Sequence, residues 1–139
     1  MSTEKNKKIV LRLFGEGMLE QNFEIFDELI ADTFMIHGVP NSNVGPKGYK
    51  IFVKQFLKAF PDMKINIQQI IAEGDTVATR GFIYGTHDGE FMGIAPTNKK
   101  IRIDYFDFWK IRDGMCIENW VQMDMAGIIQ QLGPLQFAF

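Results

Sequence analysis

Cysteine is nearly absent from this 139-residue chain, and its single copy, Cys116, allows no disulfide within one chain. Its place in an apolar strand pattern predicts a buried, inert thiol, and such a chain fits a reducing compartment. The N-terminus is polar and has no apolar signal-peptide core. No apolar run approaches the roughly 20 residues that a membrane-spanning helix needs. We therefore expect a cytoplasmic protein that is not bound to a membrane.

The chain also has no excess of basic residues and only two histidines. The chain has 15 Lys and Arg against 17 Asp and Glu, a net charge of −2. Sequence-independent binding of nucleic acid needs a basic surface, so no nucleic-acid partner is expected. The two histidines, His37 and His87, have no His or Cys close in sequence, which disfavours a zinc site. No phosphate-binding loop or nucleophile elbow occurs. We expect no metal and no cofactor.

Phenylalanine and methionine are abundant, with 13 and 8 copies. Aromatic rings supply large apolar area, and Met side chains adapt to irregular space, so this composition suggests a roomy apolar interior. The length favours one domain over residues 1–139. With 46% apolar and 23% charged residues, the composition is that of an ordinary globular domain.

The spacing of apolar residues changes along the chain from a helical period to a period of two. It predicts a helix of about fifteen residues after Ser2, a short helix after Asn22 and a third from Pro46 to Pro61. A brief extended segment at 34–36 and a loop at 38–48 separate the last two. Strands are then predicted from 63, from 76 to 86, and on both sides of Asp113-Gly114. This order predicts an α+β domain, with the helices on one face of an antiparallel sheet.

A two-residue turn at Asp113-Gly114 would set the pairing of the last two strands. Arg112 would face Met115, and alternation would then place eight residues on one face. The predicted cross-strand pairs are Trp109–Glu118, Asp107–Trp120, Tyr105–Gln122 and Ile103–Asp124. A longer turn would shift this register.

Both faces of this hairpin are partly apolar, so both need cover. The face with Trp, Tyr, Ile and a few polar groups has the pattern of a small-molecule pocket. Helices can cover one face only, and the other suits a partner subunit, as in a homodimer. The candidate residues for this dimer surface are Phe106, Phe108, Val121 and Met123.

Spacing excludes a pair of cooperating carboxylates. Glu118 and Asp124 are six strand residues apart, about 20 Å, whereas glycosidase-like dyads need roughly 5 to 10 Å. In the predicted register Asp107 and Asp124 are also too far apart. An Asp at an apolar wall has a raised pKa and suits proton transfer next to a carbonyl. Asp124 is our candidate, although it could instead cap a helix starting near Met125, or do both.

The chain resembles the SnoaL-like polyketide cyclases, also called ester cyclases, of the nuclear transport factor 2-like superfamily. The resemblance runs from about Asn6 to Gly133 and is carried by FDELIADTFMIHG, GPKGYKIFVKQFLKAFPDMK, IIAEGDTVATRGFIYGTHDGEFMGIAPTNKKI and DFWKIRDGMCIENWVQMDMAGIIQQLG. It implies a cone of about three helices wrapped by a curved antiparallel sheet around a deep pocket. Members are commonly homodimers.

The resemblance also implies an activity. In characterised members, an Asp near the end of the last strand is general acid/base for an intramolecular aldol condensation on a polyketide ester, without metal or cofactor. The matching position is Asp124, and Trp120 and Gln122 would line the pocket. The chain departs from the pattern at Asn119, where many relatives have His, and at Asn98, where PTGK is common.

Further pocket residues are expected on several elements. His37 and His87 could orient a substrate carbonyl or supply a second proton, or each could be a hydrogen-bonded structural residue. Arg80 is expected to share a face with Phe82 and Tyr84. The other expected substrate-binding residues are Phe56, Phe82, Tyr84, Tyr105 and Asp107.

The same fold hosts several functions, so three hypotheses remain at this point. The first is a cofactor-free cyclase acting on a hydrophobic substrate through Asp124. An isomerase or hydrolase on the same cone is an enzymatic alternative to it. The second is a non-catalytic binding protein for a hydrophobic small molecule. The third is a dimeric interaction module whose interior is filled by its own Phe and Met side chains.

Overall fold

The computed structural model describes residues 2–39 and 44–133, so part of the loop predicted at 38–48 lies outside the described residues. Within them, helical and strand elements follow the predicted order. The elements are α1 (Thr3–Arg12), the π-helical segment η1 (Leu13–Leu19), α2 (Ile25–Leu29), β1 (Ile30–His37), α3 (Gly45–Ala59), β2 (Lys64–Glu73), β3 (Thr76–Thr86), β4 (Lys100–Arg112), β5 (Met115–Met123) and α4 (Met125–Leu132).

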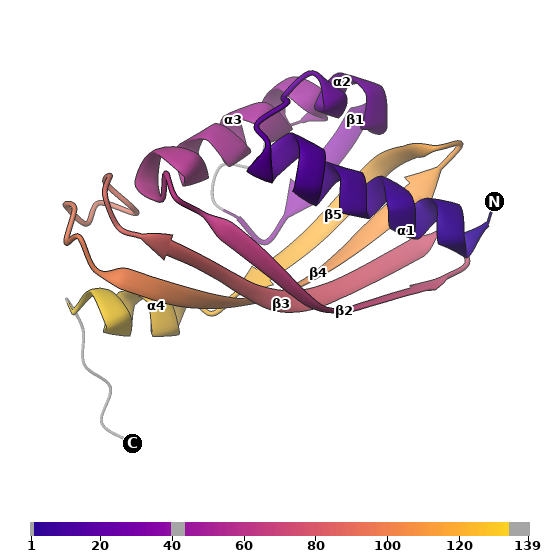
Figure 1. The fold of residues 1–139 in the computed structure, drawn as a ribbon. Coiled ribbons are helices and arrows are strands. Elements are labelled where there is room, and N and C mark those ends of the chain that lie inside the picture. Colours follow the sequence, from indigo (N-terminus) through magenta and orange to yellow (C-terminus); the bar gives the residue numbers. More distant parts are fainter. Residues whose placement is uncertain (1, 40–43, 134–139) are drawn as a thin grey trace.

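The five strands of the described chain form one curved sheet in the order β1-β5-β4-β3-β2. Neighbouring pairs from β2 to β5 are antiparallel, whereas β1 is parallel to β5. The predicted α+β cone is confirmed, and the sheet is mixed because of β1. α1, α2 and α3 all lie on the concave side of the sheet, as Figure 1 shows.

Local signals account for the ends of the helices. The Ser2 hydroxyl accepts a hydrogen bond from the Lys5 N–H and begins α1. The helix then widens into η1 at the stretch with two glycines. A Cβ on Gly17 would collide with the ring of Phe26, so this glycine lets α2 approach closely. α3 has Pro46 in its first turn, as predicted.

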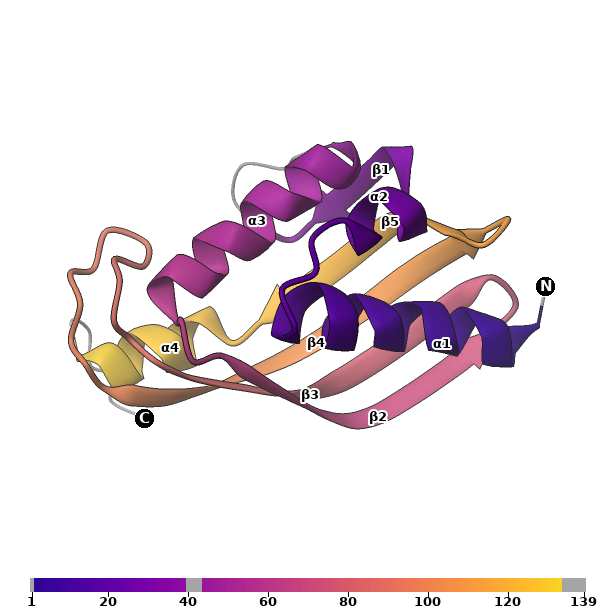
Figure 2. The same ribbon diagram turned by 45° about the horizontal axis from the view of Figure 1, so that its top comes forward.

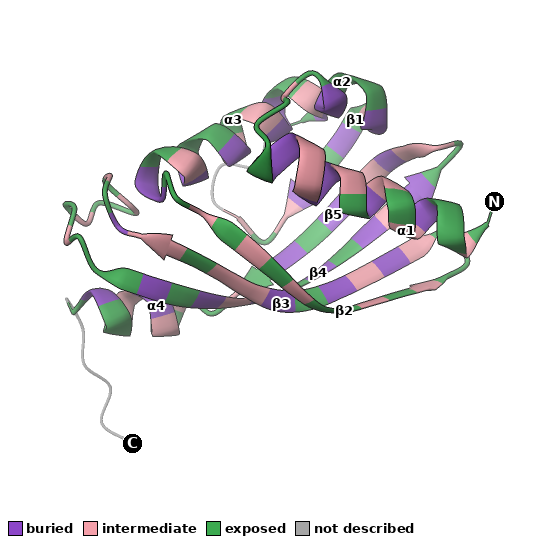
Figure 3. Cartoon of the chain, in the orientation of Figure 1, coloured by how far each residue is buried: buried purple, intermediate pink, exposed green. Residues whose placement is uncertain are grey.

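The core lies between the helices and the concave face of the sheet (Figure 2). Burial alternates along β4, whose odd-numbered residues from Ile101 to Ile111 are buried and whose even-numbered ones face outward. The coloured strands in Figure 3 follow this alternation. We call the helix-covered side the inner face and the other the outer face. The core aromatics with at most 1% exposure are Phe26, Phe34, Tyr49, Phe60 and Trp109.

The last hairpin has the predicted turn but not the predicted register. Asp113 and Gly114 have φ of 51° and 79°, as a two-residue turn requires, and Arg112 pairs with Met115. After Ile111 pairs with Cys116, the next pair is Lys110 with Glu118. The extra residue, Ile117, is a β-bulge.

The bulge exchanges the two faces of β5 relative to our prediction, which was wrong from Glu118 onward. The inner residues of β4 pair instead as Trp109–Asn119, Asp107–Val121 and Tyr105–Met123. Trp120 and Gln122 therefore lie on the outer face, opposite Phe108 and Phe106. Val121 is buried and Met123 is half-buried, so neither belongs to the outer surface for which they were proposed.

α4 continues where β5 ends and covers the first part of β4. Ile128 and Leu132 pack into a second apolar cluster with Phe60, Ile101 and Ile103, among others. No helix in residues 2–39 and 44–133 is long and apolar enough to cross a membrane.

Candidate functional site

An apolar pocket opens between the inner face and the helices. The space between its walls amounts to about 500 Å³, a volume that includes open solvent at its mouth. Aromatic and Met side chains dominate its wall. The lining residues are Phe14, Met18, Tyr49, Phe52, Val53, Phe56, Met63, Ile65, Ile83, Tyr105, Asp107, Trp109, Asn119, Val121 and Met123.

Asp107 is the only acidic side chain in the pocket lining formed by the described residues. It is on the inner face of β4 and is 4% exposed. The Thr79 hydroxyl on β3 donates to its Oδ1 at 2.5 Å, and the Tyr105 hydroxyl lies 3.1 Å from the same Thr79 oxygen. Because Thr79 has one proton to give, it accepts from Tyr105 while it donates to Asp107. The three side chains thus form a hydrogen-bonded chain that ends at the carboxyl.

The environment of Asp107 disfavours its charge. Burial raises its pKa to about 7, and the hydrogen bond from Thr79 opposes this rise without cancelling it. The indole N–H of Trp109 has a smaller effect in the same direction as Thr79, although it lies outside hydrogen-bonding geometry with Asp107. Burial also raises the pKa of Tyr105 to about 12, which keeps the phenol protonated. At neutral pH the pocket therefore holds a carboxyl divided between its acid and base forms.

Two further polar side chains stand beside Asp107. Trp109 follows it on the inner face of β4, and Asn119 lies directly opposite Trp109 on β5. The Asn119 Nδ2 donates to the Phe108 carbonyl at 2.9 Å, which holds this amide in one orientation. The polar part of the wall is thus concentrated on neighbouring strands.

Three of the ten predicted site residues line this pocket, namely Phe56, Tyr105 and Asp107. Four others face away from it. Phe82 and Tyr84 pair with Asp104 and Arg102, even-numbered residues of β4 that point outward, and Arg102 stacks on the Phe82 ring at 4.4 Å. The bulge turns Trp120 and Gln122 outward as well.

The two histidines do not line the pocket either. His37, at the end of β1, contacts Glu118 through Nε2 at 2.7 Å and stacks on Trp120 with 5.4 Å between ring centroids. His87 is fully buried, and its Nδ1 accepts from the Thr97 backbone N–H at 3.2 Å. It therefore holds the loop between β3 and β4.

Asp124 lies at the junction of β5 and α4 and is exposed. Its Oδ1 accepts from the Gly127 N–H at 2.9 Å, so it is the N-cap of α4. It is not among the pocket-lining residues. The cap is the arrangement that the structure displays, and an acid/base role for Asp124 stays a prediction.

Sequence reasoning missed Asn119 because the bulge exchanges the inner and outer faces of β5. It missed Phe14 and Met18 because their helical spacing is the same for residues of a pocket wall and of a packed core. The sequence showed the apolar helical stripe that includes Tyr49, Phe52 and Val53, but it did not show that these residues line the pocket. Among the described residues, no three His, Cys, Asp or Glu side chains cluster as a metal site would require.

Residues 8–132 match the family model of the SnoaL-like polyketide cyclases. The chain belongs to this family. This match confirms the SnoaL-like resemblance inferred from the sequence, over nearly the whole chain. None of the curated proteins matches it.

Solved structures agree with this assignment. IdmH of Streptomyces antibioticus, described as a polyketide cyclase, is 31% identical with a TM-score of 0.78, covering 92% of this chain and 98% of that one. A protein of Acidithiobacillus ferrooxidans with the same description is 29% identical, with a TM-score of 0.82 and coverage of 95% and 97%. A SnoaL-like polyketide cyclase of Jannaschia sp. CCS1, 23% identical with a TM-score of 0.88 and coverage of 96% and 95%, shares the fold.

Proposed function

We propose that this protein closes a ring on a hydrophobic, polyketide-like substrate by a cofactor-free aldol reaction in which Asp107 transfers the proton. The main support is the burial of this carboxyl in a largely apolar pocket, where its pKa is raised to about 7. A group with a pKa near the working pH is effective both as base and, once protonated, as acid. Membership in the SnoaL-like polyketide cyclase family supports the class of reaction.

The proposed step is balanced by one proton that leaves and returns. The Asp107 carboxylate removes a proton from the carbon next to a substrate carbonyl. The resulting enolate carbon attacks a second carbonyl carbon of the same molecule, forming a carbon–carbon bond and an alkoxide. The alkoxide takes the proton back from Asp107. Thr79 orients the carboxyl through its hydrogen bond, and Tyr105 supports Thr79.

The first half of this step can be tested without the natural substrate. β-Tetralone is an apolar bicyclic ketone with acidic protons beside its carbonyl, and their exchange in D₂O can be followed by NMR. We expect the protein to accelerate the exchange, with a rate that rises with pH through about 7 as Asp107 ionises. Asp107→Asn is expected to lower the protein-catalysed rate by about 100-fold or more, which is the usual contribution of a general base.

Two matched variants complete the test. Asp104→Asn removes an outward-facing carboxyl of the same strand and is expected to leave the rate unchanged. Asp124→Asn tests the base predicted from sequence, and a loss of exchange there with normal activity in Asp107→Asn would reverse our assignment. Binding of β-tetralone without exchange above the buffer rate would favour a non-catalytic binding protein.

A further inference from the structure

Two buried polar atoms of the pocket-lining residues have no hydrogen-bond partner within the described chain. They are the Nε1–H of Trp109, a donor, and the Oδ1 of Asn119, an acceptor. The side chains are 1% and 0% exposed, so bulk solvent does not reach these atoms. A buried donor or acceptor without a partner is unfavourable. Two of them in one pocket wall indicate a place prepared for a ligand group.

The two atoms belong to neighbouring side chains. Trp109 and Asn119 are a directly opposed cross-strand pair, so they stand side by side on the inner face. The orientation of the amide follows from its other hydrogen bond. The Phe108 carbonyl can only accept, so the atom that contacts it at 2.9 Å must be Nδ2. Oδ1 is then the acceptor left over, and the wall offers one donor next to one acceptor.

We propose that Trp109 and Asn119 together bind a hydroxyl group, phenolic or enolic, of an otherwise apolar ligand. The proposal deepens the function proposed above and rests on it, because it concerns the substrate of the same pocket. The ligand oxygen accepts from the Trp109 N–H, and its proton is donated to Asn119 Oδ1. A hydroxyl is the smallest group that does both.

An ether in the same place would accept from Trp109 but would leave Asn119 unsatisfied. A ligand that leaves the Asn119 acceptor unpaired therefore loses affinity relative to one that satisfies both atoms. Asn119 is thus a specificity-determining residue. Asn119 favours ligands whose oxygen carries a proton to donate, whereas Trp109 can donate to any oxygen acceptor.

The experiment is a calorimetric titration of the full chain with β-naphthol and with its methyl ether, which share the ring system and differ in that proton. We expect the wild type to prefer β-naphthol by on the order of 10-fold, the effect of one unsatisfied buried acceptor. Asn119→Ala should bring the two affinities close together. Trp109→Phe should weaken both ligands by similar factors and keep the preference.

Gln122→Ala, which removes an outward-facing amide from the same strand, is the matched control and should keep the wild-type preference. Equal affinity of the wild type for the two ligands, or binding of neither, would overturn the proposal, and neither result depends on a variant that folds. A preference that survives Asn119→Ala would also overturn it. Because the titration measures binding alone, it can succeed while Asp107-dependent exchange fails, and the reverse, so the two proposals fail separately.

Discussion

Asp107 retains its proton in the folded protein over a pH range in which an exposed Asp is ionised. Its folded pKa of about 7 lies above the ordinary value of 3.8 because burial disfavours the charged form. Between these two values the folded state binds more protons than the unfolded state. The free energy of unfolding therefore falls as pH rises from about 4 to 7. Over roughly three pH units, at about 1.4 kcal/mol each, the loss amounts to at most about 4 kcal/mol.

Asp107→Asn should reveal this effect, because an amide keeps the size of the side chain and cannot ionise. We expect the melting temperature to rise by several degrees at pH 8 and by clearly less at pH 5. Thermal denaturation of wild type and variant at the two pH values measures the difference. Asp104→Asn is the control and should show no gain that depends on pH. A variant less stable than wild type at pH 8 would contradict our account of the buried carboxyl.

At the scale of elements, α4 protects an exposed strand edge. β5 no longer pairs with the first part of β4, and the Gln131 side chain takes its place. It accepts from the Arg102 N–H at 2.9 Å and donates to the Arg102 carbonyl at 2.8 Å. Both backbone groups of Arg102 are thus satisfied by one amide, which anchors the helix to the strand.

Gln131→Ala should loosen this junction and cost about 1 to 2 kcal/mol, since both hydrogen bonds to Arg102 are lost, together with one to the Gly127 carbonyl within the helix. We expect faster hydrogen exchange at the Arg102 amide and a lower melting temperature. Gln130→Ala is a close control, because the neighbouring Gln is exposed and the Arg102 backbone bonds to Gln131 instead. Equal effects of the two substitutions would show that Gln131 acts only through helix propensity.

Several elements could be predicted because their signals are local. The turns at Gly74 and at Asp113-Gly114, and Pro46 and Pro61 around α3, are short-range features that a sequence displays directly. The parallel pairing of β1 with β5 was not predictable in the same way, because it joins segments about eighty residues apart. The bulge at Ile117 was not predictable either. In a bulge two residues of one strand face a single residue of its partner. Because this strand is apolar on both faces, the alternation of its apolar residues does not reveal the extra residue.

The candidate site could be predicted only in part, for the same reason: its residues are brought together by pairing that the sequence does not display. The sequence identified Asp107 and Tyr105 as pocket residues because they alternate with Trp109 on one strand. Asp124 was preferred as catalyst on resemblance, although its helix-cap alternative was recognised. Only the three-dimensional pairing shows that Asn119, and not Glu118, stands beside Trp109.

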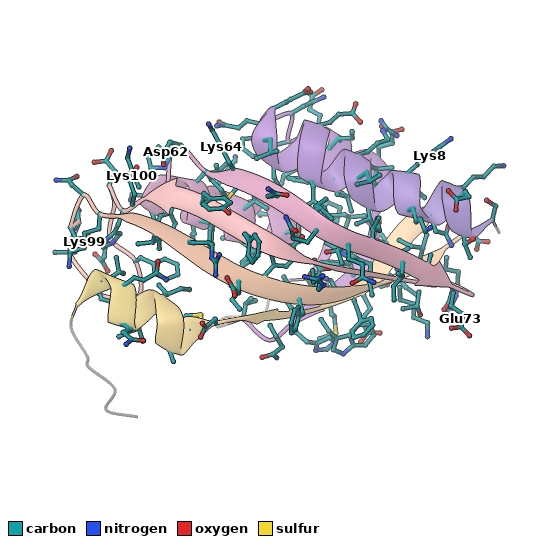
Figure 4. The ribbon with its side chains drawn as sticks, turned by 60° about the horizontal axis from the view of Figure 1, so that its bottom comes forward. Lys8, Asp62, Lys64, Glu73, Lys99 and Lys100 are labelled. Carbon is teal, nitrogen blue, oxygen red and sulfur yellow. The ribbon has the colours of Figure 1, made fainter. Side chains whose placement is uncertain are left out.

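At the scale of the whole molecule, the outer face of the sheet remains apolar at its centre. Phe106, Phe108 and Trp120 are 63%, 52% and 39% exposed. Helices α1, α2 and α3 all lie on the opposite side, and Figure 4 shows the sheet obliquely from its outer side. Exposed aromatic residues grouped in this way are typical of protein–protein contacts. We expect the outer face to pair with a second copy of the chain.

Phe106→Glu should then disrupt the dimer, because it places a charge at the centre of the contact. Sedimentation or light scattering at several concentrations would measure the mass of wild type and variant. Leu11→Glu, on the exposed side of α1, is the control and should leave the oligomeric state unchanged. A wild type that stays monomeric at high micromolar concentration would refute the expected dimer.

The bulge at Ile117 has a consequence for anyone who engineers or compares these chains. Inserting or removing one residue in the last strand shifts its pairing with β4 by one position. Everything downstream keeps its order but changes sides. If residues 118–123 were grafted onto a strand without the bulge, they would present Glu118, Trp120 and Gln122 to the ligand and expose Asn119 and Val121 to solvent. The identity of the pocket is therefore encoded partly by a residue that never touches it.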